Sequence, residues 1–194
     1  ITGNITAGSE GMYVSSSDSN VFNYTGTLAA DADAIYLNAA DSNTFNLSGT
    51  ISTDGSSKHG VSLSGGSVNN TFNLASGGNI TATGSSSSGI KLVSSSSLTA
   101  LTNLGTISGT DYGINVSSSS ITTFNNRQSG LTYNGVLPTN YNVVVNSTSD
   151  YGRTVFSSVS GSTTFGIYTG SVLAEETTYT SVVDGLTSSN IAAE

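Results

Sequence analysis

Three short motifs recur along the chain in the same order, and this repetition limits the possible folds more than any other feature. The first motif is Gly-(Thr/Asn)-(Ile/Leu), the second is a small residue followed by apolar-x-apolar, and the third contains Phe-Asn. Copies of the first motif begin at Gly3, Gly26, Gly49, Gly78 and Gly105, so successive copies are 23, 23, 29 and 27 residues apart. Self-similarity at a nearly constant period is typical of a repeat protein.

Each motif has the alternation of a short β-strand. In one copy of the second motif, Ile90 and Leu92 point to one side of a strand while Lys91 points to the other. Stacked turns share one core that a single turn cannot build, and parallel crossovers are right-handed in nearly all cases. Residues 1–126 are therefore predicted to form an all-β, right-handed, single-stranded parallel β-helix of about five turns with three strands each. Its shared core should include Ile35, Leu37, Val61, Leu63, Ile90, Leu92, Ile114 and Val116.

Residues 127–194 depart from this pattern after a last imperfect turn. Strand-like segments at 141–145, 151–156 and 163–168 are separated by turn-rich stretches of hairpin length. Because a solenoid has to cover its open end, we expect 127–194 to form a C-terminal antiparallel β cap or a lead-in to another domain. A short helix is predicted at 177–186. The apolar face of the cap should carry Val143, Phe156, Phe165 and Ile167.

The low charge of the chain excludes several classes of function. Only 8% of the residues are charged, and 4 Lys+Arg against 12 Asp+Glu give a formal net charge of -8. Without a basic patch for phosphates or anionic lipid, we expect no nucleic-acid partner and no membrane insertion by this fragment. There is no cysteine, which excludes thiolate metal sites and cysteine nucleophiles. We expect neither a metal nor a cofactor.

Candidate catalytic groups are few. The single histidine, His59, is expected in a loop as a solvated side chain rather than in a Ser-His-Asp arrangement. Asp31 and Asp33 offer the two carboxylates that glycosidic hydrolysis needs. The other aspartates are scattered one to a loop and are interpreted as turn residues. We therefore expect no catalytic residue.

The outward positions of the second motif provide the candidate binding surface. They place Tyr13, Tyr36, Ser62, Lys91 and Asn115 in one row. Tyrosines exposed on a rigid sheet suit contacts with carbohydrate or protein. Tyr13, Tyr36, Lys91 and Asn115 are therefore our candidate ligand-contact face.

Two further polar columns follow from the repeat. Asn23, Asn46 and Asn73 recur at one position, which favours a stacked amide ladder over glycan acceptors. The first motif brings pairs of Thr, Ser and Asn to the strand spacing of about 4.8 Å, as in ice-binding solenoids. Only some of these pairs are threonine, so we attribute them chiefly to β propensity.

Imperfect turns such as Asn-Thr-Phe-Asn-Leu-x-Gly-Thr-Ile at 43–51, together with the tail segments 150–153 and 161–167, resemble bacterial autotransporter passengers and related large β-helical surface adhesins. The resemblance implies a non-enzymatic fragment of a secreted or surface-displayed stalk that is exported through the outer membrane. It also implies adhesion to glycans or proteins of host or bacterial surfaces, or self-association. The alternatives are a carbohydrate-active β-helix enzyme (a polysaccharide lyase or glycoside hydrolase) and an ice-binding β-solenoid.

Overall fold

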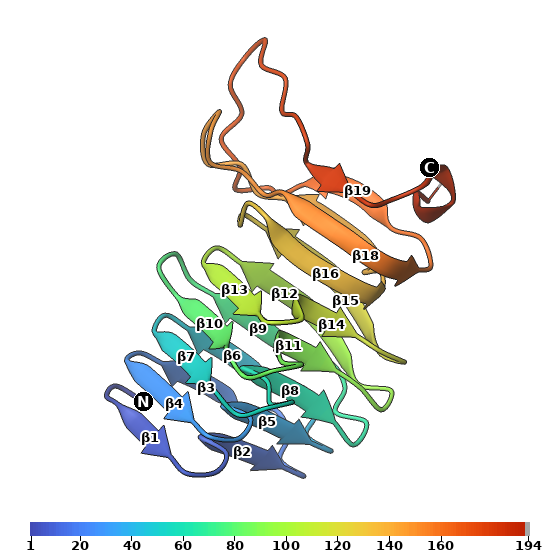
Figure 1. The fold of residues 1–194 in the computed structure, drawn as a ribbon. Coiled ribbons are helices and arrows are strands. Elements are labelled where there is room, and N and C mark those ends of the chain that lie inside the picture. The colour runs from blue at the N-terminus through green and yellow to red at the C-terminus, as the bar shows by residue number, and fades with distance from the viewer. Residues whose placement is uncertain (193–194) are drawn as a thin grey trace.

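The computed structural model describes residues 1–192, in which short strands stack turn upon turn into three sheets (Figure 1). The first sheet contains β1 (Ile5–Ala7), β4 (Thr27–Ala30), β7 (Thr50–Thr53), β10 (Asn79–Ala82) and β13 (Thr106–Gly109). The second contains β2 (Met12–Ser15), β5 (Ile35–Asn38), β8 (Val61–Ser64), β11 (Ser88–Leu92), β14 (Tyr112–Val116), β16 (Leu131–Val136), β18 (Thr154–Ser160) and β20 (Val183–Asp184). The third contains β3 (Val21–Tyr24), β6 (Thr44–Leu47), β9 (Asn70–Leu74), β12 (Ser97–Asn103), β15 (Ser120–Asn126), β17 (Asn140–Val143) and β19 (Thr164–Ile167).

Each sequence motif occupies one sheet, which confirms the predicted parallel β-helix. In the first sheet, Leu28 pairs with Ile51 of the next turn, and in the third sheet Phe45 pairs with Phe72, both in parallel register. β1 to β15 make five turns of three strands, as the repeats predict. The alternation within each motif therefore fixes which side chains enter the shared interior.

The interior of these turns is a continuous apolar column. All eight predicted core residues of the second motif are buried, with relative exposures of 0–1%. On the opposite wall, the rings of Phe22, Phe45 and Phe72 stack with centroid distances of 4.7 and 4.5 Å. Burying a side chain of this size contributes about 1.5–3 kcal/mol, so successive turns are held together mainly by this column.

One glycine column lets neighbouring turns approach closely before the first sheet. A Cβ atom on Gly49 would overlap the carbonyl oxygen of Gly26, and one on Gly26 would overlap that of Gly3. Gly26 also has a φ of 128°, which strongly favours glycine. The glycine that opens the first motif is therefore required by the stacking itself.

The expected antiparallel cap is wrong, because the solenoid continues into the tail. β16 and β18 extend the second sheet and β17 and β19 extend the third, all in parallel pairs. Among residues 1–192, the single antiparallel contact is an isolated bridge between Val145 and Tyr151. Consecutive tail strands belong alternately to the two sheets, so the short connections between them are solenoid corners rather than hairpin turns.

Two smaller expectations for the tail also fail. The segment 177–186 forms no helix and instead contains β20, while the one helical turn described is a 3₁₀ turn at Ser188–Asn190. Ile167 is 54% exposed, although Val143 and Phe156 are buried and Phe165 packs against the core as predicted. β19 is the last strand of the third sheet, so the Ile167 side chain has no following strand beside it.

The first sheet ends at β13, and a glutamine side chain covers its edge. Gln128 Nε2 donates to the carbonyl of Ile107 (3.1 Å), and Gln128 Oε1 accepts the Ile107 N–H (2.7 Å). The side-chain amide thus makes the two hydrogen bonds that a sixth strand would offer Ile107. An uncovered edge would expose these groups to pairing with other chains.

Candidate functional site

The structure places the four residues of the predicted ligand-contact face in one column on the outside of the second sheet. Tyr13 pairs with Tyr36, Tyr36 with Ser62, Ser62 with Lys91, and Lys91 with Asn115. The neighbours of these residues along each strand point into the core, so the column faces outward. Its members are about 4.8 Å apart from one strand to the next.

The two tyrosines form a stacked pair at the N-terminal end of this column. Their ring centroids are 5.3 Å apart with an interplanar angle of 16°, and Tyr13 is 56% exposed. Asn38 Nδ2 donates to the Tyr13 hydroxyl (3.3 Å), which lowers the pKa of Tyr13. The hydroxyls of Tyr36 and Ser64 are 2.8 Å apart. These contacts hold both rings in place, with Tyr13 the more exposed of the two.

At the other end, Asn115 is engaged in an amide pair. Asn134 Nδ2 donates to Asn115 Oδ1 (3.2 Å), one strand further along the second sheet. Asn115 therefore lies in the outward column and also links two successive turns through its side-chain amide.

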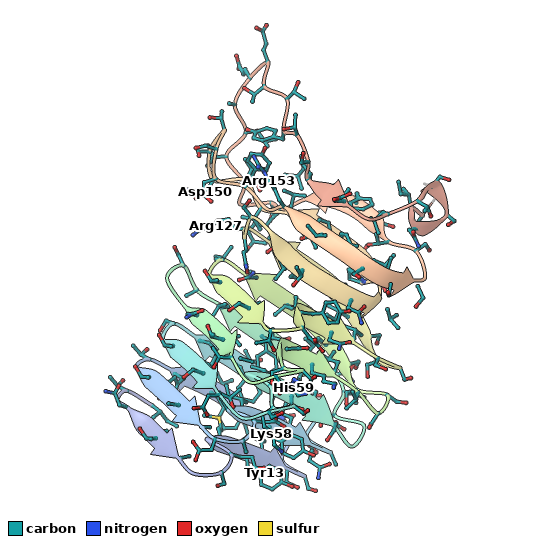
Figure 2. The ribbon with its side chains drawn as sticks, viewed as in Figure 1. Tyr13, Lys58, His59, Arg127, Asp150 and Arg153 are labelled. Carbon is teal, nitrogen blue, oxygen red and sulfur yellow. The ribbon has the colours of Figure 1, made fainter. Side chains whose placement is uncertain are left out.

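A groove of roughly 450 Å³ opens beside the middle of the column. Tyr36 and Lys91 belong to it, and Ser62 lies between them as a small, buried residue. The loop that precedes β8 supplies Lys58 and His59, which lie on the same side of the solenoid as Tyr13 (Figure 2). Glu10 and Asp33 also line this groove. We call it the tyrosine–lysine groove.

His59 is buried, with 5% exposure, so the expectation of a solvated loop histidine is wrong. Its Nδ1 accepts the backbone N–H of Ser88 in the next turn (3.0 Å). Burial, assisted by the nearby charges of Lys91 and Lys58, lowers the pKa of His59 to about 4. The ring is therefore neutral at physiological pH and serves as a hydrogen-bond acceptor between turns.

Asp33 accepts a similar hydrogen bond from the next turn, one turn before His59. Its Oδ1 accepts the backbone N–H of His59 (2.6 Å), and burial raises its pKa. His59 and Asp33 therefore do not form the His–Asp pair of a Ser-His-Asp arrangement, in which Nδ1–H donates to the carboxylate. Here Nδ1 accepts a backbone N–H, and Asp33 accepts the backbone N–H of His59 instead of a ring N–H.

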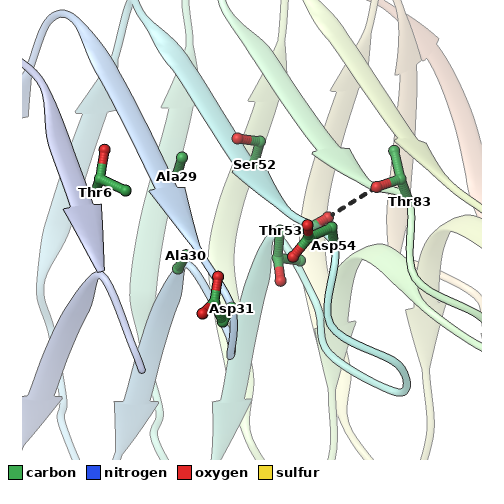
Figure 3. A pocket seen from close by; sticks show the side chains of 8 residues that line it. All are labelled: Thr6, Ala29, Ala30, Asp31, Ser52, Thr53, Asp54 and Thr83. Carbon is green, nitrogen blue, oxygen red and sulfur yellow. Dashed lines mark hydrogen bonds between the residues drawn. The ribbon is translucent and has the colours of Figure 1, made fainter. Parts of the chain in front are cut away.

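Asp31 and Asp33 do not form a pair of carboxylates around one site. Asp31 lines a separate hollow of roughly 320 Å³ on the first sheet, where it lies with Asp54 at the ends of β4 and β7 (Figure 3). Thr83 closes this hollow and donates to the Thr53 carbonyl (3.4 Å). Because Asp33 faces the tyrosine–lysine groove instead, the two carboxylates face different surfaces.

The predicted amide ladder is confirmed on the outside of the third sheet. Asn46 Nδ2 donates to Asn23 Oδ1 (2.8 Å), and Asn73 Nδ2 donates to Asn46 Oδ1 (2.9 Å). A shallow groove of roughly 380 Å³ runs beside it. Each ladder bond links two consecutive turns, which gives these asparagines a structural role.

The sequence reasoning missed Glu10, Lys58 and His59 as groove residues. A signal was available, because Glu10, Asp33 and His59 each come directly before the small residue that opens the second motif. In a solenoid, equivalent positions of successive repeats stack into a column. Aligning the repeats one position further would have placed these three side chains on one edge of the second sheet.

Comparison of the chain with protein-family models, curated proteins and solved structures found no match. In residues 1–192, no helix has the length and apolar character needed to cross a bilayer. No group of three or more His, Cys, Asp or Glu side chains in that part of the chain is arranged to hold a metal ion.

Proposed function

We propose that this chain is a non-enzymatic segment of a secreted or surface-displayed β-helical adhesin of the autotransporter-passenger type, and that it contacts surface glycans. The observation that carries the proposal is the stacked Tyr13–Tyr36 pair on the second sheet, in which Tyr13 is exposed and Tyr36 is half-buried. Exposed aromatic rings offer sugar rings an apolar face together with a polar hydroxyl edge. The parallel strands beneath them fix their separation, so little conformational entropy is lost when a ligand binds.

Two general features support an extracellular, stalk-like role. Stacked turns give a long, rigid surface, and folding can propagate from one turn to the next as the chain emerges during export. The chain has no cysteine, so no disulfide can form early and block passage through an outer membrane. Contacts with a surface protein, or between copies of the chain, are the alternative modes of adhesion.

The test is binding to immobilised neutral and acidic glycans, with the double variant Tyr13→Ala/Tyr36→Ala. Binding should fall about tenfold or more, as for truncated aromatic anchors at other interfaces. Tyr168→Ala, which removes a half-buried tyrosine near β19, is the matched control and should bind like the wild type. The proposal fails if no glycan binds the wild type, or if the double variant binds equally well.

The same incubations examine the enzymatic alternative. Glu10 and Asp33 are the carboxylates of the tyrosine–lysine groove. Chromatography of the oligosaccharides after incubation should show unchanged chain lengths. Shorter products that disappear with Asp33→Asn would overturn the non-enzymatic proposal.

A further inference from the structure

Both lysines of the chain, Lys58 and Lys91, lie in the tyrosine–lysine groove. They come from different elements, since Lys58 belongs to the loop before β8 and Lys91 to β11. In residues 1–192, neither ammonium group makes an ion pair, and neither donates a hydrogen bond to another side chain or to the backbone. Two cations without a protein partner in one groove indicate a site for an anionic group.

The two arginines of the chain, unlike the lysines, have partners within the protein. Arg127 Nε lies 3.8 Å from Asp150 Oδ1, and the guanidinium of Arg153 lies 4.5 Å from the centre of the Tyr151 ring. Both arginines are near the C-terminal end of the solenoid, far from Lys58 and His59 (Figure 2). Each therefore has a partner within the protein, whereas the lysines have none in the part of the chain that is described.

The two carboxylates of the groove do not neutralise the lysines directly. Asp33 is half-buried, and its Oδ1 accepts the His59 N–H within the protein. Glu10 makes no ion pair with either lysine within residues 1–192. His59 adds no competing cation, because its pKa is lowered to about 4.

The dimensions of the groove fit a sugar ring with an acidic substituent. Ser62 separates Tyr36 from Lys91 in the column, so these two large side chains are two strands apart, about 10 Å. The small side chain of Ser62 lies between them, and Ser64 of the same strand also lines the groove. Tyr36 offers a ring face on one side, and the lysines offer positive charge on the other.

We propose that the tyrosine–lysine groove binds an acidic sugar, with the sugar ring against Tyr36 and its carboxylate or sulfate between Lys58 and Lys91. This inference rests on the proposed glycan contact and adds the chemical class of the ligand. Uronic acids within a polysaccharide and sialic acids at the ends of glycans share this chemistry. In a chain with a net charge of -8, this groove is the place where an acidic ligand meets unpaired cations.

The test is isothermal titration of the intact chain with a galacturonic acid oligomer and with sialyllactose, each compared with a neutral counterpart, a galactose oligomer or lactose. We expect each acidic ligand that binds to bind more tightly than its neutral counterpart, and the two acidic ligands together distinguish the two sources. Lys58→Gln and Lys91→Gln should each weaken acidic binding about tenfold and leave any neutral binding unchanged.

The double variant Lys58→Arg/Lys91→Arg keeps both charges and should retain most of the acidic preference. Thermal unfolding of every variant checks that the fold is intact. Equal affinity for acidic and neutral sugars, or Lys→Gln variants that bind acidic sugars normally, would overturn this inference while leaving the glycan contact in place. Absence of binding to any sugar would instead overturn the proposed function together with this inference.

Discussion

The five turns up to Asn126 and the two turns that follow are built on the same sheets but are stabilised differently. The first region has three sheets around aliphatic side chains and a Phe22–Phe45–Phe72 stack. The second region lacks the first sheet and fills its interior with larger aromatic residues, including Tyr133 and Tyr141. In the second region these aromatic side chains fill the space between the two remaining walls.

The junction also contains a buried polar network that joins the last strands of the first region to the second region. Asn126 Oδ1 accepts from Asn103 Nδ2, and Asn126 Nδ2 donates to Thr154 Oγ1, both at 3.0 Å. The Tyr141 hydroxyl lies 2.8 Å from the same Thr154 oxygen. These buried side chains thus satisfy one another's hydrogen-bonding groups at the point where the first sheet ends.

The largest expected effect comes from the aromatic ring that couples the two regions. Phe124 is fully buried, and its ring centroid lies 6.1 Å from that of Tyr133 and 5.6 Å from that of Tyr141. Phe124→Ala should cost about 3–5 kcal/mol in the free energy of unfolding. Hydrogen exchange should show that β16 to β19 lose protection before the earlier turns.

Phe72→Ala is the matched control, because Phe72 is equally buried but lies within the first region. Its cost should be similar, without selective loss of protection in the tail. If both variants unfold with the same regional pattern, the two regions form one cooperative unit and do not differ in stability as expected.

The next largest effect is expected from acid, which should destabilise the first region more than the second because the only histidine lies in the first region. The pKa of His59 is about 4 in the folded protein and 6.5 for an ordinary histidine, so below pH 6.5 the unfolded chain binds a proton that the folded chain does not. The associated stability is present above pH 6.5 and is lost as the pH falls towards 4, a loss of about 3 kcal/mol at most. The raised pKa of Asp33 acts in the opposite sense and offsets part of it.

Urea unfolding across this pH range measures the effect. His59→Asn retains a side-chain acceptor for the Ser88 N–H but does not titrate, so its unfolding free energy should change less between pH 6.5 and 4. An equal pH dependence in the variant would assign the effect to groups other than His59.

The smallest effect should come from the edge of the first sheet at β13, because the second region has no strand in that sheet. Gln128→Ala removes both hydrogen bonds to Ile107, which water replaces in part, and should cost about 1–3 kcal/mol. The Ile107 amide should exchange faster, whereas the Ile80 amide, inside the sheet, should not change. Gln128→Glu keeps an acceptor but loses the donor, so it should fall between wild type and Gln128→Ala.

Much of the first region follows from sequence periodicity. Alternation in each motif identifies the buried residues, and constant spacing identifies which residues stack, as with Ile90 on Ile114 or Asn46 on Asn23. These relations are local or repeat exactly once per turn, so a single sequence contains them. The outward column from Tyr13 to Asn115 was predictable for the same reason.

The remaining features depend on where the chain turns a corner, and only the tertiary structure shows those positions. Short polar connections fit a hairpin and a solenoid corner equally well, so only the pairing of β16 to β19 shows that the tail is parallel. Burial of His59 and the separation of Asp31 from Asp33 likewise depend on the path of the loops between strands. The sequence determined the periodic interior, whereas only the folded chain decided which corner residues meet across turns, since those contacts have no period to reveal them.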